Sequence, residues 1–302
     1  MSTTLNPRPA ERDRRPLPPA PASAGHTTAR PELTAAYRWS SALALVAGIA
    51  AAVGAFFPAV LSANAPMTAG NARGTDVVML ALAVPALVIA MLLVARGSRR
   101  AAIVWLGALA YILYNSVFFA YGTHFNGLFL SYATALSLGV WSVLSLLRAV
   151  DTEDLRARFA PDTPVRAIAG YLLVTTVLFV FNDLRDVVPA IAGNTVPNSL
   201  TGTGLVTNPV AMTDLAFAFP LTALAAVWLW QRRALGYLLA GAFLVYGVIE
   251  AVGVATDQWF GHVSDPSQSA GAVPLFVGLA LVGLVPLVIY LRALRSEPGA
   301  RR

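Results

Sequence analysis

Long apolar runs alternate with short polar segments along the chain after about residue 36. A membrane-spanning helix needs about 20 apolar residues, because each residue adds ~1.5 Å to its length. Eight runs meet this requirement, at about residues 39–61, 76–95, 101–121, 128–147, 165–182, 208–230, 234–255 and 272–291. The pattern predicts an all-α fold, a polytopic membrane helical bundle of eight transmembrane helices.

The composition agrees with a membrane location. Hydrophobic residues make up 57% of the 302 residues and charged residues only 12%, whereas about a quarter of the residues of a soluble protein are charged. We therefore expect membrane lipids to surround the chain. It contains no cysteine, which excludes disulfides, thiolate metal sites and thiol catalysis. All its basic residues are arginine, which together with the high alanine content points to a high-GC bacterial source.

The arginines also predict the orientation of the spans. If the N-terminal tail lies in the cytoplasm, 19 of the 21 basic residues fall on that side, and only Arg73 and Arg185 lie opposite. Basic loops stay in the cytoplasm under the positive-inside rule. We expect a multi-pass protein of the bacterial plasma (inner) membrane with both termini cytoplasmic. This one-sided distribution also explains the high pI without a nucleic-acid partner.

Three regions are expected along the chain. Residues 1–36 form a Pro- and Arg-rich cytoplasmic tail without apolar periodicity, which is typical of disorder. Residues 37–295 form the membrane domain, and residues 296–302 form a short basic cytoplasmic tail. An alternative treats the first run as a signal peptide cleaved near Ala63–Ala65, but that run is longer than the apolar core of such a peptide, which is typically about 7 to 15 residues.

The predicted outer loops are 62–75, 122–127, 183–207 and 256–271. The third is the longest, and a loop of that length in a compact protein is often a binding segment or a lid. On the inner side, residues 148–166 mix arginines with acidic residues and predict a short surface helix.

Three polar residues lie inside the predicted spans at a common depth. Asn115, Asp214 and Glu250 are each about six residues from the outer end of their helix, which corresponds to roughly 9 Å. A charge at the centre of a span costs about 2.5 to 3.5 kcal/mol, so we expect these groups to face a protein interior or a water-filled cavity and to converge. The alternative is a purely structural hydrogen bond between Glu250 and Asn115.

Residues 111–132 are unusually rich in aromatic and amide side chains and predict a hairpin of two helices. Tyr111 and Asn115 fall on one helical face, and His124 and Asn126 fall in the glycine-flanked turn. Together with Asp214 and Glu250, these four are the candidate ligand-binding or proton-coupling residues. The alternative is a tight turn with an aromatic interfacial belt.

Other chemistry finds little support in the sequence. His124 and His262 could contribute to a metal site, but no histidine or acidic spacing typical of metal ligands is present, so no metal or other cofactor is expected. No nucleophile motif or phosphate-binding glycine loop occurs. Pro220 is expected to kink the sixth span beside Asp214.

Part of the third span resembles part of the seventh. The register that pairs Leu106 with Leu238 also pairs Tyr114 with Tyr246. This match suggests a duplicated four-span unit with both copies oriented alike.

Several segments of spans three to seven resemble bacterial multi-span membrane proteins of uncharacterised activity. They are Tyr114–Asn115, Phe125–Leu130, Thr207–Val210, Asp214–Ala216, Pro220, Leu229–Arg233 and Gly236–Tyr237. The resemblance implies a membrane-embedded fold and assigns no catalytic residue.

Two classes of function follow from these residues. The first is a transporter or binding protein for a small molecule or lipid, in which Asp214 and Glu250 hold a proton or a cationic or hydroxylated ligand. The second is an intramembrane enzyme that uses the two carboxylates as general acid and base on a lipid-linked substrate. A structural partner of a membrane complex is a third alternative, and the oligomeric state is left open.

Overall fold

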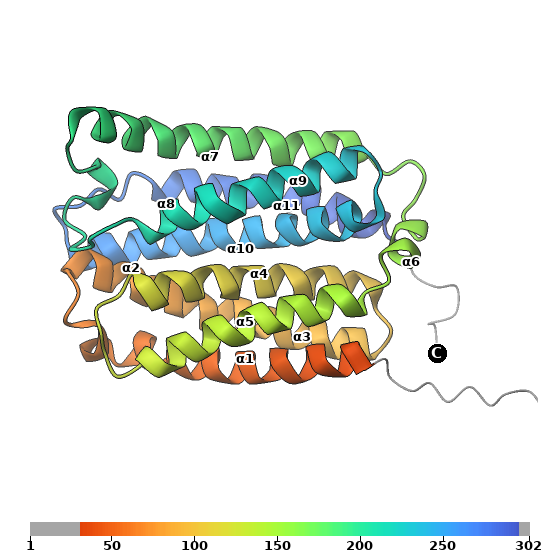
Figure 1. Cartoon of the computed structure of the whole chain (residues 1–302), viewed down its shortest axis with the longest axis horizontal. Helices are drawn as coiled ribbons and strands as arrows, with labels where there is room; N and C mark the ends of the chain where they lie inside the picture. Colours follow the sequence, from red (N-terminus) through yellow and green to blue (C-terminus); the bar gives the residue numbers. More distant parts are fainter. Residues whose placement is uncertain (1–30, 296–302) are drawn as a thin grey trace, which may run out of the picture.

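The computed structural model describes residues 31–295, which form an all-helical bundle (Figure 1). The elements are α1 (Pro31–Phe56), η1 (Pro58–Leu61), α2 (Pro66–Val78), η2 (Met79–Ala83), α3 (Val84–Ala95), α4 (Arg99–Tyr121), α5 (Phe129–Ala149), α6 (Thr152–Ala157), α7 (Val165–Gly193), η3 (Asn198–Leu200), α8 (Pro209–Thr213), η4 (Asp214–Ala218), α9 (Phe219–Trp230), α10 (Ala234–Ser264) and α11 (Val273–Ala293). Over these residues the structure has no strand, only an isolated bridge between Phe159 and Leu294.

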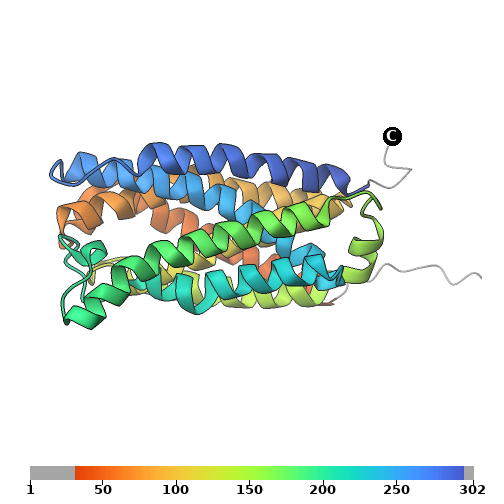
Figure 2. The same cartoon turned by 90° about the horizontal axis from the view of Figure 1, so that it is seen from above.

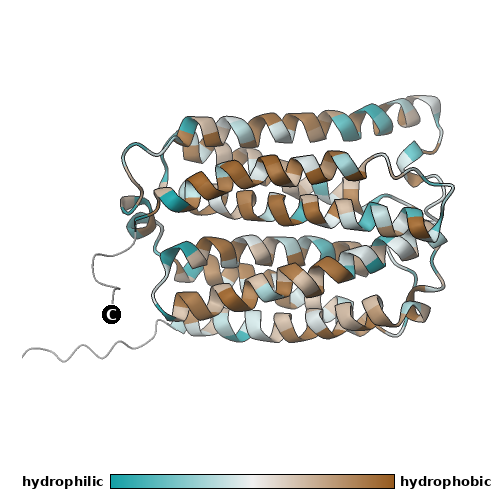
Figure 3. Ribbon diagram, turned by 180° about the vertical axis from the view of Figure 1, so that it is seen from behind, coloured by the Kyte–Doolittle hydropathy of each residue, from teal (hydrophilic) through white to brown (hydrophobic). Residues whose placement is uncertain are grey.

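Eight helical stretches of the described chain are long and apolar enough to cross a membrane. They are α1, the continuous α2–η2–α3, α4, α5, α7, the continuous α8–η4–α9, α10 and α11. The predicted all-α, eight-span architecture is confirmed at this level, and it is consistent with a multi-pass membrane protein. Figure 3 shows hydrophilic residues gathered toward both ends of the bundle and apolar residues between them.

The two ends of the bundle differ in their basic residues. We call the end with α6 and the α3–α4 connection the arginine end, and the end with residues 57–65, 122–128, 194–208 and 265–272 the loop end (Figures 1 and 2). Among the described arginines, only Arg73 and Arg185 lie toward the loop end. The one-sided arrangement expected from the sequence is thus present in the folded chain.

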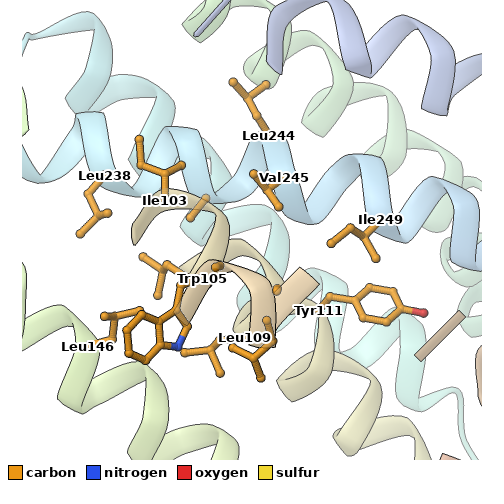
Figure 4. Packing of buried hydrophobic residues seen from close by; sticks show 14 of the residues in the cluster. Ile103, Trp105, Leu109, Tyr111, Leu146, Leu238, Leu244, Val245 and Ile249 are labelled. Atoms are coloured by element: carbon orange, nitrogen blue, oxygen red, sulfur yellow. The ribbon is translucent and has the colours of Figure 1, made fainter. Parts of the chain in front are cut away.

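Helices α4 and α10 form the centre of the bundle, and their facing side chains are buried (Figure 4). A methyl group at Gly107 of α4 would lie 2.7 Å from the Ala242 carbonyl of α10, so the two backbones approach closely. Small residues allow such approach between membrane helices. Trp105 and Tyr111 of α4 are fully buried, and Trp105 Nε1 donates to Ser40 Oγ of α1 at 3.0 Å.

Several helices extend beyond the predicted spans, which corrects the expected loops. Residues 66–75, 183–193 and 256–264 are helical although the sequence analysis places them in outer loops. The reason is that hydropathy detects only the apolar part of a helix. In α2, the polar segment stays helical because Gly70 and Gly74 let it pack directly on α10, where methyl groups at these positions would lie 2.8 Å from Gly261 Cα and 2.6 Å from Asp257 Cα.

The first helix also begins earlier than expected. Residues 31–36 belong to the tail in the sequence analysis, but α1 begins at Pro31. Proline is favoured in the first turn of a helix, where its missing N–H is not needed, and Glu32 suits the positive end of the helix dipole. The rest of the predicted tail, residues 1–30, and the predicted tail at residues 296–302 lie outside the described residues.

The predicted inner surface helix is α6, which is held by ion pairs. Asp154 lies 3.0 Å from Arg158 Nη2 and 3.3 Å from Arg99 Nη2. These two arginines lower the pKa of the Asp154 carboxyl from its ordinary value, with the hydrogen bond from Arg158 as the main cause. The segment after α6 then joins the end of the described chain through the bridge between Phe159 and Leu294.

The two halves of the chain repeat one another in the register that pairs α4 with α10. Helices α3 and α9 have the same length and begin at Val84 and Phe219. Helices α4 and α10 begin at Arg99 and Ala234, which are separated by the same interval. The turns before α4 and α10 repeat as well, because Gly97 and Arg232 both have a positive φ, 88° and 56°.

The spans before these helices share an irregular feature. Each contains a short π-helical segment, η2 or η4, and a proline at the second position after that segment, Pro85 or Pro220. A π-helical turn widens the helix and frequently marks a functional site. The structure therefore places a π-helical segment, starting at Asp214 itself, where the sequence predicts a kink.

The register of the repeat corrects the one suggested by the sequence, which pairs Tyr114 with Tyr246. In the structure, the element boundaries pair Tyr111 with Tyr246 and Asn115 with Glu250. The two registers differ by nearly one helical turn of ~3.6 residues, so both align similar faces of Ala- and Leu-rich helices. The element boundaries distinguish the two registers, whereas residue matching alone does not.

Candidate functional site

Asn115 and Glu250 meet at the interface between α4 and α10. The Asn115 side chain is 6% exposed. Its Nδ2 donates to Glu250 Oε2 at 3.3 Å and to the Tyr111 carbonyl at 3.1 Å. The two residues occupy equivalent positions of the repeat, so the polar contact lies where the two halves of the bundle face each other. The predicted convergence is confirmed for this pair.

Asp214 approaches the pair from η4, at the start of the π-helical segment. Its carboxyl lies near the Tyr114 hydroxyl, and Asp214 and Glu250 lie within electrostatic range of each other. The Tyr114 ring packs edge-on against Tyr246 of α10, with ring centroids 5.7 Å apart. The rings of Tyr114 and Tyr246 thus lie in the same region as the carboxyls of Asp214 and Glu250.

Tyr111 lies beside this group and is fully buried. Its hydroxyl makes no hydrogen bond, and it lies close to Gly253, where an added methyl group would be 3.0 Å from the oxygen. Glu250, Asp257 and Asp76 lie within electrostatic range of this hydroxyl. The structure therefore brings Tyr111, Asn115, Asp214 and Glu250 into one region of the bundle.

His124 and Asn126 are not part of that group. The His124 backbone N–H donates to Asn64 Oδ1 at 2.8 Å, and its ring Nδ1 lies 3.2 Å from the same oxygen. Asn126 Nδ2 donates to the His124 carbonyl, and its Oδ1 accepts from the Leu128 N–H. These bonds shape the 122–128 turn, so the geometry gives the two residues a structural role that the sequence analysis treats only as the alternative.

A polar pocket of about 470 Å³ opens at the loop end between α7, η3 and α8. Asp186 closes one wall, because its carboxylate accepts the backbone N–H groups of Asn198 and Ser199 at 3.0 Å each. Asp183 is less fully bonded, since its Oδ2 is buried without a hydrogen-bond partner. Arg185 also lines the pocket. The pocket is thus lined by two acidic residues, Asp183 and Asp186, and by Arg185.

The pocket is linked electrostatically to the intramembrane carboxyls. Asp183 lies within electrostatic range of Asp214, and Asp214 lies within electrostatic range of Glu250. Polar groups therefore follow one another from the loop end inward to the interface between α4 and α10. In the described chain, no arginine forms an ion pair with any of these three carboxyls.

The structure adds a residue that the sequence analysis does not select, Asp76, which lies in α2 just before η2. Its side chain is 2% exposed and its Oδ2 has no hydrogen-bond partner. Nothing in the local sequence singles it out, because it stands at the edge of an apolar run near Arg73 and resembles half of an exposed ion pair. In the structure, Arg73 Nε instead donates to the Ala55 carbonyl at 3.0 Å, and its guanidinium lies 5.7 Å from the Phe260 ring centre.

Within residues 31–295, no group of three histidine or acidic side chains is arranged to hold a metal ion. His262, the other histidine considered for such a site, has its Nδ1 2.6 Å from the Gln268 carbonyl.

Comparisons of the chain with protein-family models, with curated proteins and with solved structures find no match.

Proposed function

We propose that this protein binds a small polar molecule at the loop end and transports it across the membrane, with Asp214 and Glu250 holding the proton or cationic group that moves. The observation that carries the proposal is the run of polar groups from the 470 Å³ pocket through Asp183 to Asp214 and Glu250. Intramembrane carboxyls without a cationic partner are costly and mark proton and substrate pathways in many transporters.

The position of the site supports the same function. Transporters built from structural repeats hold their substrates at the interface between the repeats, often beside discontinuous helices. Here Asn115 and Glu250 occupy equivalent positions of two repeated segments, and Asp214 begins a π-helical segment followed by Pro220. Such interruptions supply hinges at which a span can bend.

The pocket also limits the ligand. Asp183 brings a carboxyl group suited to an ammonium or hydroxyl group, and Arg185 brings a guanidinium suited to an anionic or carbonyl group. A volume of about 470 Å³ falls in the range of roughly 300 to 1,000 Å³ typical of small-molecule sites. We therefore assign a small cationic or hydroxylated ligand in preference to a whole lipid.

The proposal includes the orientation of the protein. The arginine end faces the cytoplasm of a bacterial plasma membrane and the pocket opens to the outside, in accordance with the positive-inside rule.

The test is solute uptake by purified protein in proteoliposomes, with a pH-sensitive dye inside. A panel of small amines, amino acids and polyols is screened first for a rise in melting temperature in detergent. We expect at least one hit that is taken up together with a change of internal pH. Glu250→Gln should abolish the pH change, whereas the matched variant Glu153→Gln, in exposed α6, should behave like the wild type.

The competing enzymatic function predicts a different result. A deletion strain would then show an altered lipid profile, and purified protein would convert a lipid-linked substrate without any uptake. That outcome would overturn the transport proposal.

A further inference from the structure

A small cavity lies between α1, α2, α4 and α5. Its volume is about 20 Å³ and its polar wall consists of Asp76, Ser116 and Tyr132. Every residue that lines it is buried. A cavity needs roughly 10 to 15 Å³ to accommodate one water-sized body, so this one has room for a single such occupant.

The polar atoms around the cavity are left without partners. Asp76 Oδ2 and Tyr132 Oη are both buried and make no hydrogen bond. Asn126 Nδ2 donates to the His124 carbonyl and its Oδ1 accepts from the Leu128 N–H, and neither atom is a hydrogen-bond partner of Tyr132 Oη. Ser116 Oγ donates to the Ile112 carbonyl at 2.7 Å and keeps its lone pairs free to accept. Asp76, Ser116 and Tyr132 thus bring three oxygen-bearing side chains to the wall of one cavity.

Gly54 of α1 holds the Asp76 carboxyl in place. A methyl group at Gly54 would overlap Asp76 Oδ2, so the carboxyl packs directly on the bare backbone of α1. No basic side chain of the described residues forms an ion pair with Asp76. A buried carboxylate in such surroundings is stable only when its charge is neutralised.

We propose that Asp76, Ser116 and Tyr132 form a binding site for one dehydrated monovalent cation of the size of Na⁺. One carboxylate balances one positive charge, whereas a divalent ion would leave an uncompensated charge in an apolar environment. Mg²⁺ is disfavoured further because it usually retains several waters, for which this cavity has no room. Hydroxyl and carboxylate oxygens are suitable ligands for a hard cation.

This site is distinct from the Asn115–Glu250 contact and does not rest on the proposed transport. The two lie on neighbouring positions of α4, since Ser116 follows Asn115 in the chain. Tyr111 lies within electrostatic range of both Asp76 and Glu250.

The experiment measures the melting temperature of the purified full-length protein in detergent as Na⁺ replaces choline at constant ionic strength and pH. A ligand that binds only the folded state raises the melting temperature as its concentration passes the dissociation constant. We expect a saturable rise with Na⁺ in the wild type and parallel binding of radiolabelled sodium. Both responses should vanish in Asp76→Asn, which retains the shape of the side chain.

Two tyrosine variants form a matched pair. Tyr132→Phe removes only the cavity oxygen and should weaken apparent sodium affinity by about tenfold or more. Tyr121→Phe changes a tyrosine that is exposed at the same end of the bundle, so it should leave the affinity unchanged. This pair keeps the test decisive if Asp76→Asn does not fold.

Two results would overturn the proposal. The first is an equal response to Na⁺ in the wild type and Asp76→Asn, which would place sodium elsewhere. The second is a wild type that responds to pH through Asp76 but not to Na⁺, which would mean that the carboxyl is merely protonated and the cavity holds a structural water.

Discussion

Asn115 and Glu250 stand at equivalent positions of two repeated segments and are joined by a 3.3 Å hydrogen bond. The contact joins α4 to α10, the two central helices of the bundle. Because a parallel repeat places equivalent residues at the same depth, the register that unites these two side chains follows from the repeat itself. A shift of either helix by one residue would turn the polar groups away from each other.

The Asn115–Glu250 bond should contribute measurably to stability. Asn115→Leu leaves Glu250 without its donor, so we expect the free energy of unfolding to fall by about 0.6 to 2 kcal/mol, the range of interhelical hydrogen bonds in membranes. Unfolding in mixed detergent micelles measures the change. His124→Ala is the comparison, since its backbone bond to Asn64 survives and the exposed residue packs little; its effect should stay within about 0.5 kcal/mol. If His124→Ala lowers the free energy of unfolding more than Asn115→Leu does, the 122–128 turn contributes more to stability than the Asn115–Glu250 contact.

Gly54 should tolerate no side chain. Gly54→Ala places a methyl group on top of Asp76 Oδ2, so the helices must separate or the carboxyl must move, at a cost of about 1 to 3 kcal/mol. Gly48→Ala, on the same helix, meets only a Val84 methyl at 3.8 Å, and should be neutral or stabilising by up to about 1 kcal/mol. Melting temperatures of the two variants in one detergent provide the comparison. Equal melting temperatures for Gly54→Ala and Gly48→Ala would show that Asp76 packs loosely against α1.

The orientation can be tested with reporters placed in the loops that the structure defines. Insertions at Gly97, between α3 and α4, and at Arg158, directly after α6, should report a cytoplasmic location. Insertions within 195–206 and 265–271 should report an external one. Two reporters, one active only outside the cytoplasm and one active only in the cytoplasm, distinguish the two locations. A cytoplasmic signal from 195–206 contradicts the proposed orientation.

The ion pairs of α6 should make stability sensitive to acid. The neighbouring arginines lower the pKa of Asp154 below its ordinary value of 3.8, so the ionised form is favoured in the folded state. The contribution is complete above the ordinary pKa and is lost as the pH falls through the lowered pKa of the folded state. Asp154→Asn should flatten the loss of melting temperature as the pH falls below about 4. The effect should be small, because Asp154 is partly exposed and solvent screens the charges. If the melting temperature of Asp154→Asn depends on pH in the same way as that of the wild type, other groups cause the sensitivity to acid.

The sequence alone determined the architecture of this protein, because apolar runs of sufficient length and one-sided arginines are local properties of the chain. They identified eight spans and the common end of the arginines. They also identified Asn115 and Glu250 as partners, since two polar residues at one depth have few other ways to be satisfied in hydrocarbon.

Only the tertiary structure decided how far the helices extend and which carboxyls are buried. The polar segment of α2 is helical because its glycines pack on α10, and no hydropathy scale contains that contact. Asp76 is likewise a candidate ligand only in the tertiary structure, because its burial comes from contacts between helices. Its burial depends on Gly54 of α1, Ser116 of α4 and Tyr132 of α5. Residues so far apart in the chain meet only when the helices pack, so their meeting leaves no periodic signal in the sequence.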